Sequence, residues 1–292
     1  MRMTTLTTVD AAASGTFAIG GDLKVNRLGF GAMRIVGEGV WGEPKDAENS
    51  KRVLRRAVEL GVNFIDTSDA YGPDVSELLI GEALAPYKDG VVIATKAGLV
   101  RTGPGKWEPL GRPAYLRQEV EMSLRHLQLE RLDLWQLHRI DPLVPVEESL
   151  GEIAKLQQEG KIRHVGLSEV KPHEIEQARK VIEIVSVQNK YNLGDRGHED
   201  VVDYCTKEGI AFIPWFPVAA GKLAQPGGNL DAVAKKHGVT VGQLSLAWLL
   251  HRSPVILPIP GTSSVEHLEE NIASGTVKLS DAEWAEIEAA AK

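Results

Sequence analysis

From about residue 28 to its end, the chain alternates short apolar segments with longer amphipathic ones, and this alternation limits the fold more than any other feature. The apolar segments are rich in β-branched and aromatic residues, as buried strands are. Eight such segments begin at residues 28, 63, 91, 132, 163, 185, 211 and 255. Eight parallel strands with following helices in 292 residues predict an α/β fold of the (β/α)8 TIM-barrel type.

The segments between these strands have helical periodicity. Leu116, Val120, Leu124 and Leu127 recur at intervals of four, four and three, which places them on one helix face. Further helices are expected near 46–60, 74–85, 146–159, 172–183, 198–208, 230–251 (in two pieces) and 264–274. An extra C-terminal helix is expected to begin at Ser280, whose hydroxyl suits an N-cap.

The N-terminal part lies outside the barrel pattern. Residues 1–14 lack the apolar core of a signal peptide and are expected to be a disordered lead-in to a single domain over 15–292. Within that domain, 16–19 and 23–25 flank Gly20 and Gly21, which predicts a β-hairpin that caps one end of the barrel. No apolar run approaches the length of a membrane span.

Charge and cysteine content narrow the classes of partner. A formal net charge of −7 gives no reason to expect a polyanion, so neither nucleic acid nor a membrane is the expected partner, and a small molecule is. The single cysteine, Cys205, forms no intrachain disulfide and is expected to be buried and inert, which favours the cytoplasm. The eight histidines show no spacing typical of a metal site, so no metal is expected.

A doubly wound dinucleotide fold is the main rival architecture. It requires G-x-G-x-x-G after the first strand, but Arg34 stands at the third glycine position after Gly29 and Gly31. The barrel therefore remains the predicted fold.

Polar side chains stand where three neighbouring strands of the predicted barrel end. Asp66, Lys96 and His138 end the strands that begin at 63, 91 and 132, and Tyr71 follows Asp66 in the next loop. The carboxyl ends of barrel strands meet at one mouth, where active sites lie. Each residue alone is more often a cap, a snorkelling lysine or a hydrogen-bonded histidine, but together they predict a catalytic group.

These four side chains suit the protonation of an oxygen. The phenol of Tyr71 holds a proton at neutral pH, and a nearby ammonium from Lys96 would lower its pKa by stabilising phenolate. Asp66 would keep Lys96 charged and oriented. His138 would hydrogen-bond a substrate carbonyl oxygen. The group is therefore expected to protonate a carbonyl oxygen while a hydride attacks the carbon.

The stretches DTSDAYG, ATKAG, LWQLHRID, VGLSE, VQNKYN and IPGTSSVEHLEEN, in this order, resemble the aldo-keto reductase superfamily from the first barrel strand to the last helix. The resemblance places the family's catalytic tetrad on Asp66, Tyr71, Lys96 and His138. It implies NADPH-dependent reduction of an aldehyde or ketone to the alcohol, with Tyr71 as general acid.

By the same resemblance, cofactor contacts fall along the whole strand-end rim. The residues implied are Ala32, Met33, Asp66, Ser168 and Gln188, a stacking Trp215, then Phe216, Pro217, Val218, Gly221 and Leu223 along the pyrophosphate, and Gly261, Thr262, Ser263, His267, Glu270 and Asn271 at the adenosine end. The N-terminus of the helix near Ser264 suits a ribose 2′-phosphate, although a serine there also caps a helix.

Two departures from the family pattern affect the cofactor. Many relatives carry a Lys near Gly261 and an Arg at His267, so NADH stays open beside NADPH. Glu169 stands where relatives often have Asn, and a carboxylate accepts but cannot donate a hydrogen bond, which makes it a second choice for a cofactor contact.

Substrate choice is expected to come from loops that overhang the mouth. The loops 37–44 and 98–113 contain Trp41 and Trp107, which would either wall the pocket or pack on the barrel rim. Arg139 and Asp141 are expected to pair with each other. Two other functions stay open, namely an alcohol or sugar dehydrogenase and a non-catalytic NADPH-binding sensor or partner subunit.

Overall fold

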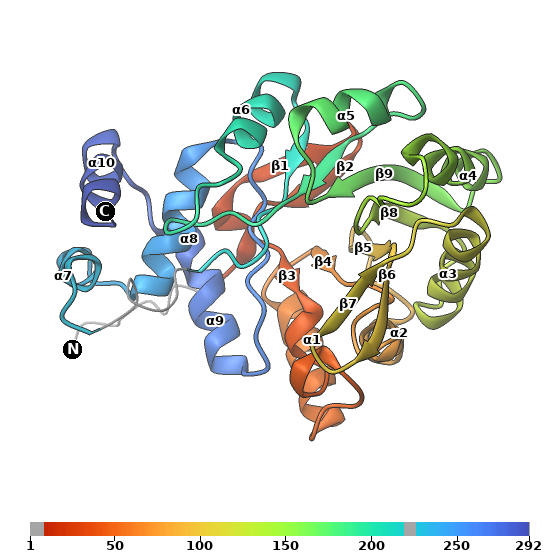
Figure 1. Ribbon diagram of the computed structural model, residues 1–292. Coiled ribbons are helices and arrows are strands. Elements are labelled where there is room, and N and C mark those ends of the chain that lie inside the picture. The colour runs from red at the N-terminus through yellow and green to blue at the C-terminus, as the bar shows by residue number, and fades with distance from the viewer. Residues whose placement is uncertain (1–8, 219–225, 292) are drawn as a thin grey trace.

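The computed structural model describes residues 9–218 and 226–291, and its centre is a parallel sheet surrounded by helices (Figure 1). The sheet has seven strands in the order β11-β10-β9-β8-β5-β4-β3. Their bounds are Phe30–Gly31 (β3), Phe64–Asp66 (β4), Val92–Ala97 (β5), Leu132–Leu137 (β8), Ile162–Ser168 (β9), Ser186–Gln188 (β10) and Ala211–Phe212 (β11). Every neighbouring pair is parallel, as the sequence predicts.

The predicted eighth strand at 255–261 is wrong as a regular strand, yet this segment closes the barrel. Phe212 N–H donates to Val255 O (2.9 Å) and Leu257 N–H donates to Phe212 O (2.8 Å). On the other side, Gly29 N–H donates to Pro258 O (2.9 Å). Pro258 and Pro260 have no N–H, so they cannot complete a ladder of hydrogen bonds. The (β/α)8 barrel architecture is nevertheless confirmed.

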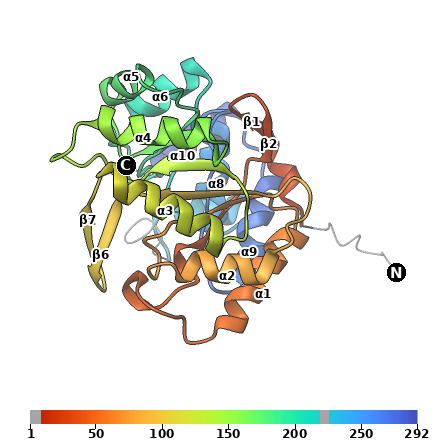
Figure 2. The same ribbon diagram turned by 90° about the vertical axis from the view of Figure 1, so that its right-hand side faces the viewer.

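Ten α-helices occur in the described part of the chain and surround the barrel (Figures 1 and 2). They are Ala47–Glu59 (α1), Val75–Leu84 (α2), Pro113–His126 (α3), Val146–Gln158 (α4), Pro172–Arg179 (α5), Glu199–Glu208 (α6), Asn229–Lys236 (α7), Val241–Arg252 (α8), Val265–Ala273 (α9) and Asp281–Ala290 (α10). Residues 230–251 do form two helices. α10 is the predicted extra helix: the Ser280 hydroxyl accepts from Glu283 N–H, and the helix packs on α7 and α8.

A hairpin of Thr16–Ile19 (β1) and Leu23–Asn26 (β2) closes the amino-terminal end of the barrel. Ile19, Leu23 and Val25 are buried in one cluster with inward-facing barrel residues such as Phe64 and Leu134. This end of the barrel is therefore filled with apolar side chains, as the predicted cap requires, and the opposite mouth is left for a site.

The expected disordered lead-in is wrong for its last residues. Ala11–Ser14 form a short 3-10 helix (η1) that Asp10 caps by accepting from Ala12 N–H. Ala11 is fully buried, and the Ser14 hydroxyl accepts from Leu28 N–H at 3.0 Å. Ala11–Ser14 has only four residues, which are too few for a periodic pattern that would predict this packing. Residues 1–8 lie outside the described part of the chain.

A second hairpin, which the sequence interpretation treats as a loop, follows β5. It consists of Leu99–Gly103 (β6) and Lys106–Pro109 (β7), paired antiparallel. Figure 2 shows it on the side of the molecule opposite the β1–β2 hairpin. Because it directly follows β5, it lies next to the strand end that carries Lys96.

Two further expectations concern the single cysteine and membrane-spanning segments. Cys205 is fully buried in α6, and burial raises the pKa of its thiol to about 12, so it is inert as expected. None of the helices described here is both long enough and apolar enough to cross a bilayer.

Candidate active site

The four predicted catalytic side chains meet at the barrel mouth. Lys96 Nζ donates to Asp66 Oδ2 at 2.9 Å and to Thr67 O at 2.6 Å, and it lies 3.4 Å from Tyr71 Oη. Lys96 is fully buried, and Asp66, Tyr71 and His138 are each at most 6% exposed. Such burial strengthens the interaction between the ammonium and the phenol, because little water screens it.

Asp66 is held by amides as well as by Lys96. Gln188 Nε2 donates to Asp66 Oδ1 at 2.7 Å, and Gln136 Nε2 lies 3.5 Å from the same oxygen. Gln188 is one of the predicted cofactor contacts, and its amide nitrogen is here committed to the carboxylate. Asp66 is therefore fixed by partners from β5, β8 and β10 before any ligand binds.

Burial dominates the protonation of Tyr71. It raises the pKa of the phenol above its ordinary value, and the Lys96 ammonium acts in the opposite direction without overcoming it. Burial alone would lower the pKa of Lys96, but Asp66 and Tyr71 outweigh it and leave that pKa raised. The phenol thus keeps its proton at neutral pH beside a charged lysine, although the sequence suggests a lowered phenol pKa.

His138 is neutral in this setting, and a serine that the sequence interpretation does not single out holds its ring. Burial, and then the charges of Lys96 and Arg139, keep the pKa of His138 well below its ordinary value. Its Nδ1 lies 3.1 Å from Ser68 Oγ, which also lies 2.8 Å from Asp69 Oδ1. Ser68 and Asp69 sit inside the DTSDAYG motif, but nothing in their spacing indicates that they face His138.

A cavity of about 770 Å³ opens beside the tetrad. Its lining includes three tetrad members (Asp66, Tyr71 and His138), eight of the predicted cofactor contacts other than Asp66 (Met33, Ser168, Gln188, Trp215, Phe216, Pro217, Val218 and Gly261) and the predicted pocket wall Trp107. Lys96 lies behind them. The cavity therefore gives a small molecule direct access to the phenol and the imidazole.

Arg101, another residue without a sequence signal, holds the aromatic wall. Its guanidinium lies 3.6 Å from the centre of the Trp107 ring and 5.8 Å from that of Trp41, and it donates to the carbonyls of Val40 and Ala70. Trp107 packs edge-on against Tyr71 at 6.4 Å between ring centres. Trp41 is 36% exposed and does not line this cavity, so its contact with a substrate stays a prediction.

The expected ion pair between Arg139 and Asp141 is wrong. Arg139 Nη1 donates to Ser168 Oγ at 3.0 Å and lines the cavity, whereas Asp141 accepts from the backbone N–H groups of Gly111 and Leu143. Loop carboxylates commonly satisfy local backbone donors in this way. Because Arg139 does not pair with Asp141, its guanidinium contributes a positive charge to the cavity wall.

The carboxylate of Glu169, which stands where relatives often have Asn, holds the ring of Trp215. Its Oε1 accepts from the indole Nε1 of Trp215 at 2.6 Å and from Lys190 N–H at 2.6 Å. The backbone of Glu169 is left-handed, with φ of 57°, which turns the side chain toward this corner. Glu169 therefore fixes the orientation of the aromatic ring that lines the cavity.

A second cavity of about 420 Å³ adjoins the first. Met33, Arg34, Val40 and Gly261 line both cavities, and Thr262, Ser263 and residues 36–39 complete the smaller one. The other predicted cofactor residues fall elsewhere: Ala32 is buried, His267, Glu270 and Asn271 lie on α9 and line neither cavity, and Gly221 and Leu223 lie outside the described residues.

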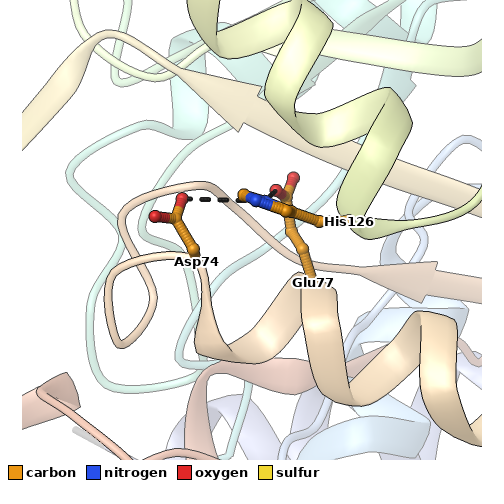
Figure 3. A group of neighbouring side chains, drawn as sticks. All are labelled: Asp74, Glu77 and His126. Atoms are coloured by element: carbon orange, nitrogen blue, oxygen red, sulfur yellow. Dashed lines mark hydrogen bonds and ion pairs between the residues drawn. The ribbon is translucent and has the colours of Figure 1, made fainter.

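A separate group of titratable side chains lies between α2 and α3 (Figure 3). His126 Nδ1 is 3.4 Å from Glu77 Oε2 and 3.8 Å from Asp74 Oδ1. Each of the three residues offers one atom that could also ligate a cation. The hydrogen bond to Glu77 raises the pKa of His126, so the imidazolium itself supplies a counter-charge. They come from the start of α2, with Asp74 at its N-cap, and from the last residue of α3, which is why no spacing in the sequence indicates them.

Comparisons with known proteins identify the family of the chain. Residues 27–292 match the model of the aldo/keto reductase family. An uncharacterized oxidoreductase of Schizosaccharomyces pombe is 55% identical over 96% of this chain and 91% of its own, and pyridoxine 4-dehydrogenase of Escherichia coli is 46% identical over 92% and 96%. A crystal structure of an aldo-keto reductase from Klebsiella pneumoniae in complex with NADPH superimposes with a TM-score of 0.80, at 26% identity over 94% of each chain. The chain belongs to the aldo/keto reductase family of oxidoreductases, as its motifs predict.

Proposed function

We propose that the enzyme reduces an aldehyde to the alcohol with NADPH, and that Tyr71 donates the proton. The observation that carries this proposal is the position of Lys96 Nζ, which lies 2.9 Å from Asp66 Oδ2 and 3.4 Å from Tyr71 Oη in a fully buried setting. A cation so placed stabilises the phenolate that forms when the proton leaves.

The residues around the cavity have different roles in the proposed reaction. Neutral His138 can donate a hydrogen bond to the substrate oxygen from Nε2 in the tautomer in which Nδ1 accepts from the Ser68 hydroxyl, because one nitrogen of a neutral ring donates and the other accepts. Tyr71 holds its proton beside the same space. NADPH, when bound, supplies the hydride to the carbonyl carbon. The proton then passes from Tyr71 Oη to the substrate oxygen, and Lys96 stabilises the phenolate left behind.

The cavities fit an elongated dinucleotide. The larger one reaches the tetrad, the smaller one extends it past Gly261 toward Thr262 and Ser263, and the two share lining residues. Trp215, anchored by Glu169, offers a flat face for a nicotinamide ring. Ser168 and Gln188 are proposed to contact its carboxamide. Residues 216–218, Thr262, Ser263 and the α9 residues are proposed to bind the remainder of NADPH.

An aromatic aldehyde is the substrate class that we favour, and pyridoxal is the first compound to assay. Support comes from the 46% identity to pyridoxine 4-dehydrogenase. The cavity also offers Trp107 as an apolar wall and Arg139 as a cation for an anionic or phenolic oxygen. The name of that relative equally favours the oxidising direction, in which the phenolate of Tyr71 would accept the proton of the alcohol.

Initial rates of NADPH consumption test this proposal. Pyridoxal, benzaldehyde and an aliphatic aldehyde are compared, and pyridoxine with NADP+ tests the reverse reaction. Turnover of aromatic aldehydes at least tenfold faster than of the aliphatic one supports the substrate class. Tight NADPH binding in a calorimeter without turnover of any compound in either direction would instead favour a cofactor sensor.

A further inference from the structure

The side chain of Arg34 forms no hydrogen bond or ion pair with a described residue. Only two other arginines in the described part of the chain share this property. By contrast, Arg27 donates to three carbonyls, Arg56 pairs with Glu269 and Arg101 donates to loop carbonyls. Arg112 and Arg125 share the unpaired state, but neither lines either of the two cavities at the barrel mouth. Arg34 lines both of them.

The position of Arg34 follows from a close approach of two backbones. A Cβ on Gly261 would lie 2.5 Å from Gly31 O, so a side chain at position 261 would force the closing segment away from β3. The same Cβ position is 3.6 Å from Arg34 Cγ. The aliphatic part of the Arg34 side chain therefore lies over Gly261, where a larger residue would not fit.

Among the described residues that line the smaller cavity, Arg34 is the only cation. Glu38 is the one acid in the lining, and it forms no ion pair with Arg34. Farther out, Arg52 donates to Asn49, and Glu266 accepts from the Ser264 hydroxyl. An unpaired guanidinium between two adjoining cavities is suited to a phosphate, which it can bind through two parallel N–H groups.

We propose that Arg34 binds a phosphate of the dinucleotide cofactor and so contributes to the choice of cofactor; this inference rests on the proposed function. Two phosphates could supply the ligand. The pyrophosphate is common to NADP+ and NAD+, whereas the ribose 2′-phosphate is present only in NADP+.

Calorimetric titration of the full chain with NADP+ and with NAD+ tests the inference, with Arg34→Gln as the variant. Loss of a charged hydrogen bond predicts affinity weakened about ten- to hundredfold. Weaker binding of NADP+ alone supports contact with the 2′-phosphate, and equal weakening of both cofactors supports contact with the pyrophosphate. Arg34→Lys should recover part of the affinity, because it keeps the charge but loses the paired donors.

Arg125→Gln is the matched control, since Arg125 is an exposed arginine on α3 without a described partner. If Arg34→Gln binds both cofactors as Arg125→Gln and the wild type do, the inference is overturned while the proposed function stands. If the wild type binds neither cofactor, the proposed function is overturned together with the inference. Arg34 is exposed, so an unchanged melting temperature should show that the variant is folded.

Discussion

Two regions of the molecule balance the charge of their carboxylates in different ways. At the mouth, Asp66 lies against the ammonium of Lys96 and two glutamine amides. Between α2 and α3, Glu119 of α3 adds a third carboxylate whose charge interacts with those of Asp74 and Glu77. The described residues provide no lysine or arginine partner for these three carboxylates, and His126 supplies the positive charge. The catalytic region is therefore balanced by a lysine whose charge does not change near neutral pH, and the outer region by a group that titrates there.

This difference indicates what each region can tolerate. A fixed ion pair holds the Tyr71 phenol in one geometry over a wide pH range, as proton donation requires. The outer group lines neither cavity at the barrel mouth, so we expect a change in its charge to affect stability more than the reaction. Four substitutions test this difference between the two regions.

Tyr71→Phe should remove most of the turnover. Because general acid catalysis contributes about 10²- to 10⁴-fold, kcat should fall by that amount, while the affinity for NADPH should change by less than about threefold. Single-turnover kinetics and calorimetry measure the two quantities separately. A large loss of NADPH binding with little change in kcat would mean that Tyr71 belongs to the cofactor site rather than to the proton path.

Glu169→Ala should weaken cofactor binding about tenfold, because the Trp215 indole loses the carboxylate that orients it. Glu169→Gln is the matched control, since its amide oxygen still accepts from the indole, and it should lie within about threefold of the wild type. Calorimetric titration with NADPH is the suitable measurement, because tryptophan fluorescence would itself change. Equal effects of the two variants would show that the charge, and not the orientation of Trp215, matters.

The sequence predicts the fold and the tetrad well, because both depend on local patterns. Apolar runs ending in Asp66, Lys96 and His138 are sufficient to place these residues at one barrel mouth. The interactions that support them are not local: Ser68, Arg101 and Glu169 act on residues far from them in sequence. Their roles follow only from the packing of loops. The failure at 255–261 has another origin, since Pro258 and Pro260 accept hydrogen bonds from the first barrel strand and the residue before it but have no N–H to donate to the other side.

Ser68→Ala tests the junction between the two regions. Ser68 links His138 to Asp69, and burial together with the charge of Glu77 raises the pKa of Asp69 well above its ordinary value. Without the hydroxyl, His138 loses the group that orients its ring, so kcat should fall about three- to tenfold with NADPH affinity unchanged.

The control for this variant is Ser123→Ala, which removes a buried hydroxyl that has no described partner. Steady-state rates from pH 6 to 9 should show the fall in kcat only for Ser68→Ala. A fall in kcat of the same size in both variants would point to a general loss of stability instead.

Glu119→Gln should have the smallest effect, on stability rather than on rate. Burial and the charges of Asp74 and Glu77 raise the pKa of Glu119 to about 7. The folded state then binds a proton more tightly than the unfolded chain, so the free energy of unfolding falls as pH rises from about 4.5 to about 7. The raised pKa of His126 acts in the same direction.

Removing the Glu119 charge should therefore stabilise the protein by about 1 kcal/mol above pH 7, a value reduced from the full shift because the side chain is partly exposed. Urea denaturation at pH 5 and pH 8 measures the effect, with Glu130→Gln as an exposed control that has no described ion pair. Glu119→Gln should stabilise at pH 8 and be nearly neutral at pH 5. If it destabilises at pH 8, the carboxylate has a favourable partner, and the outer region is balanced in the same manner as the tetrad.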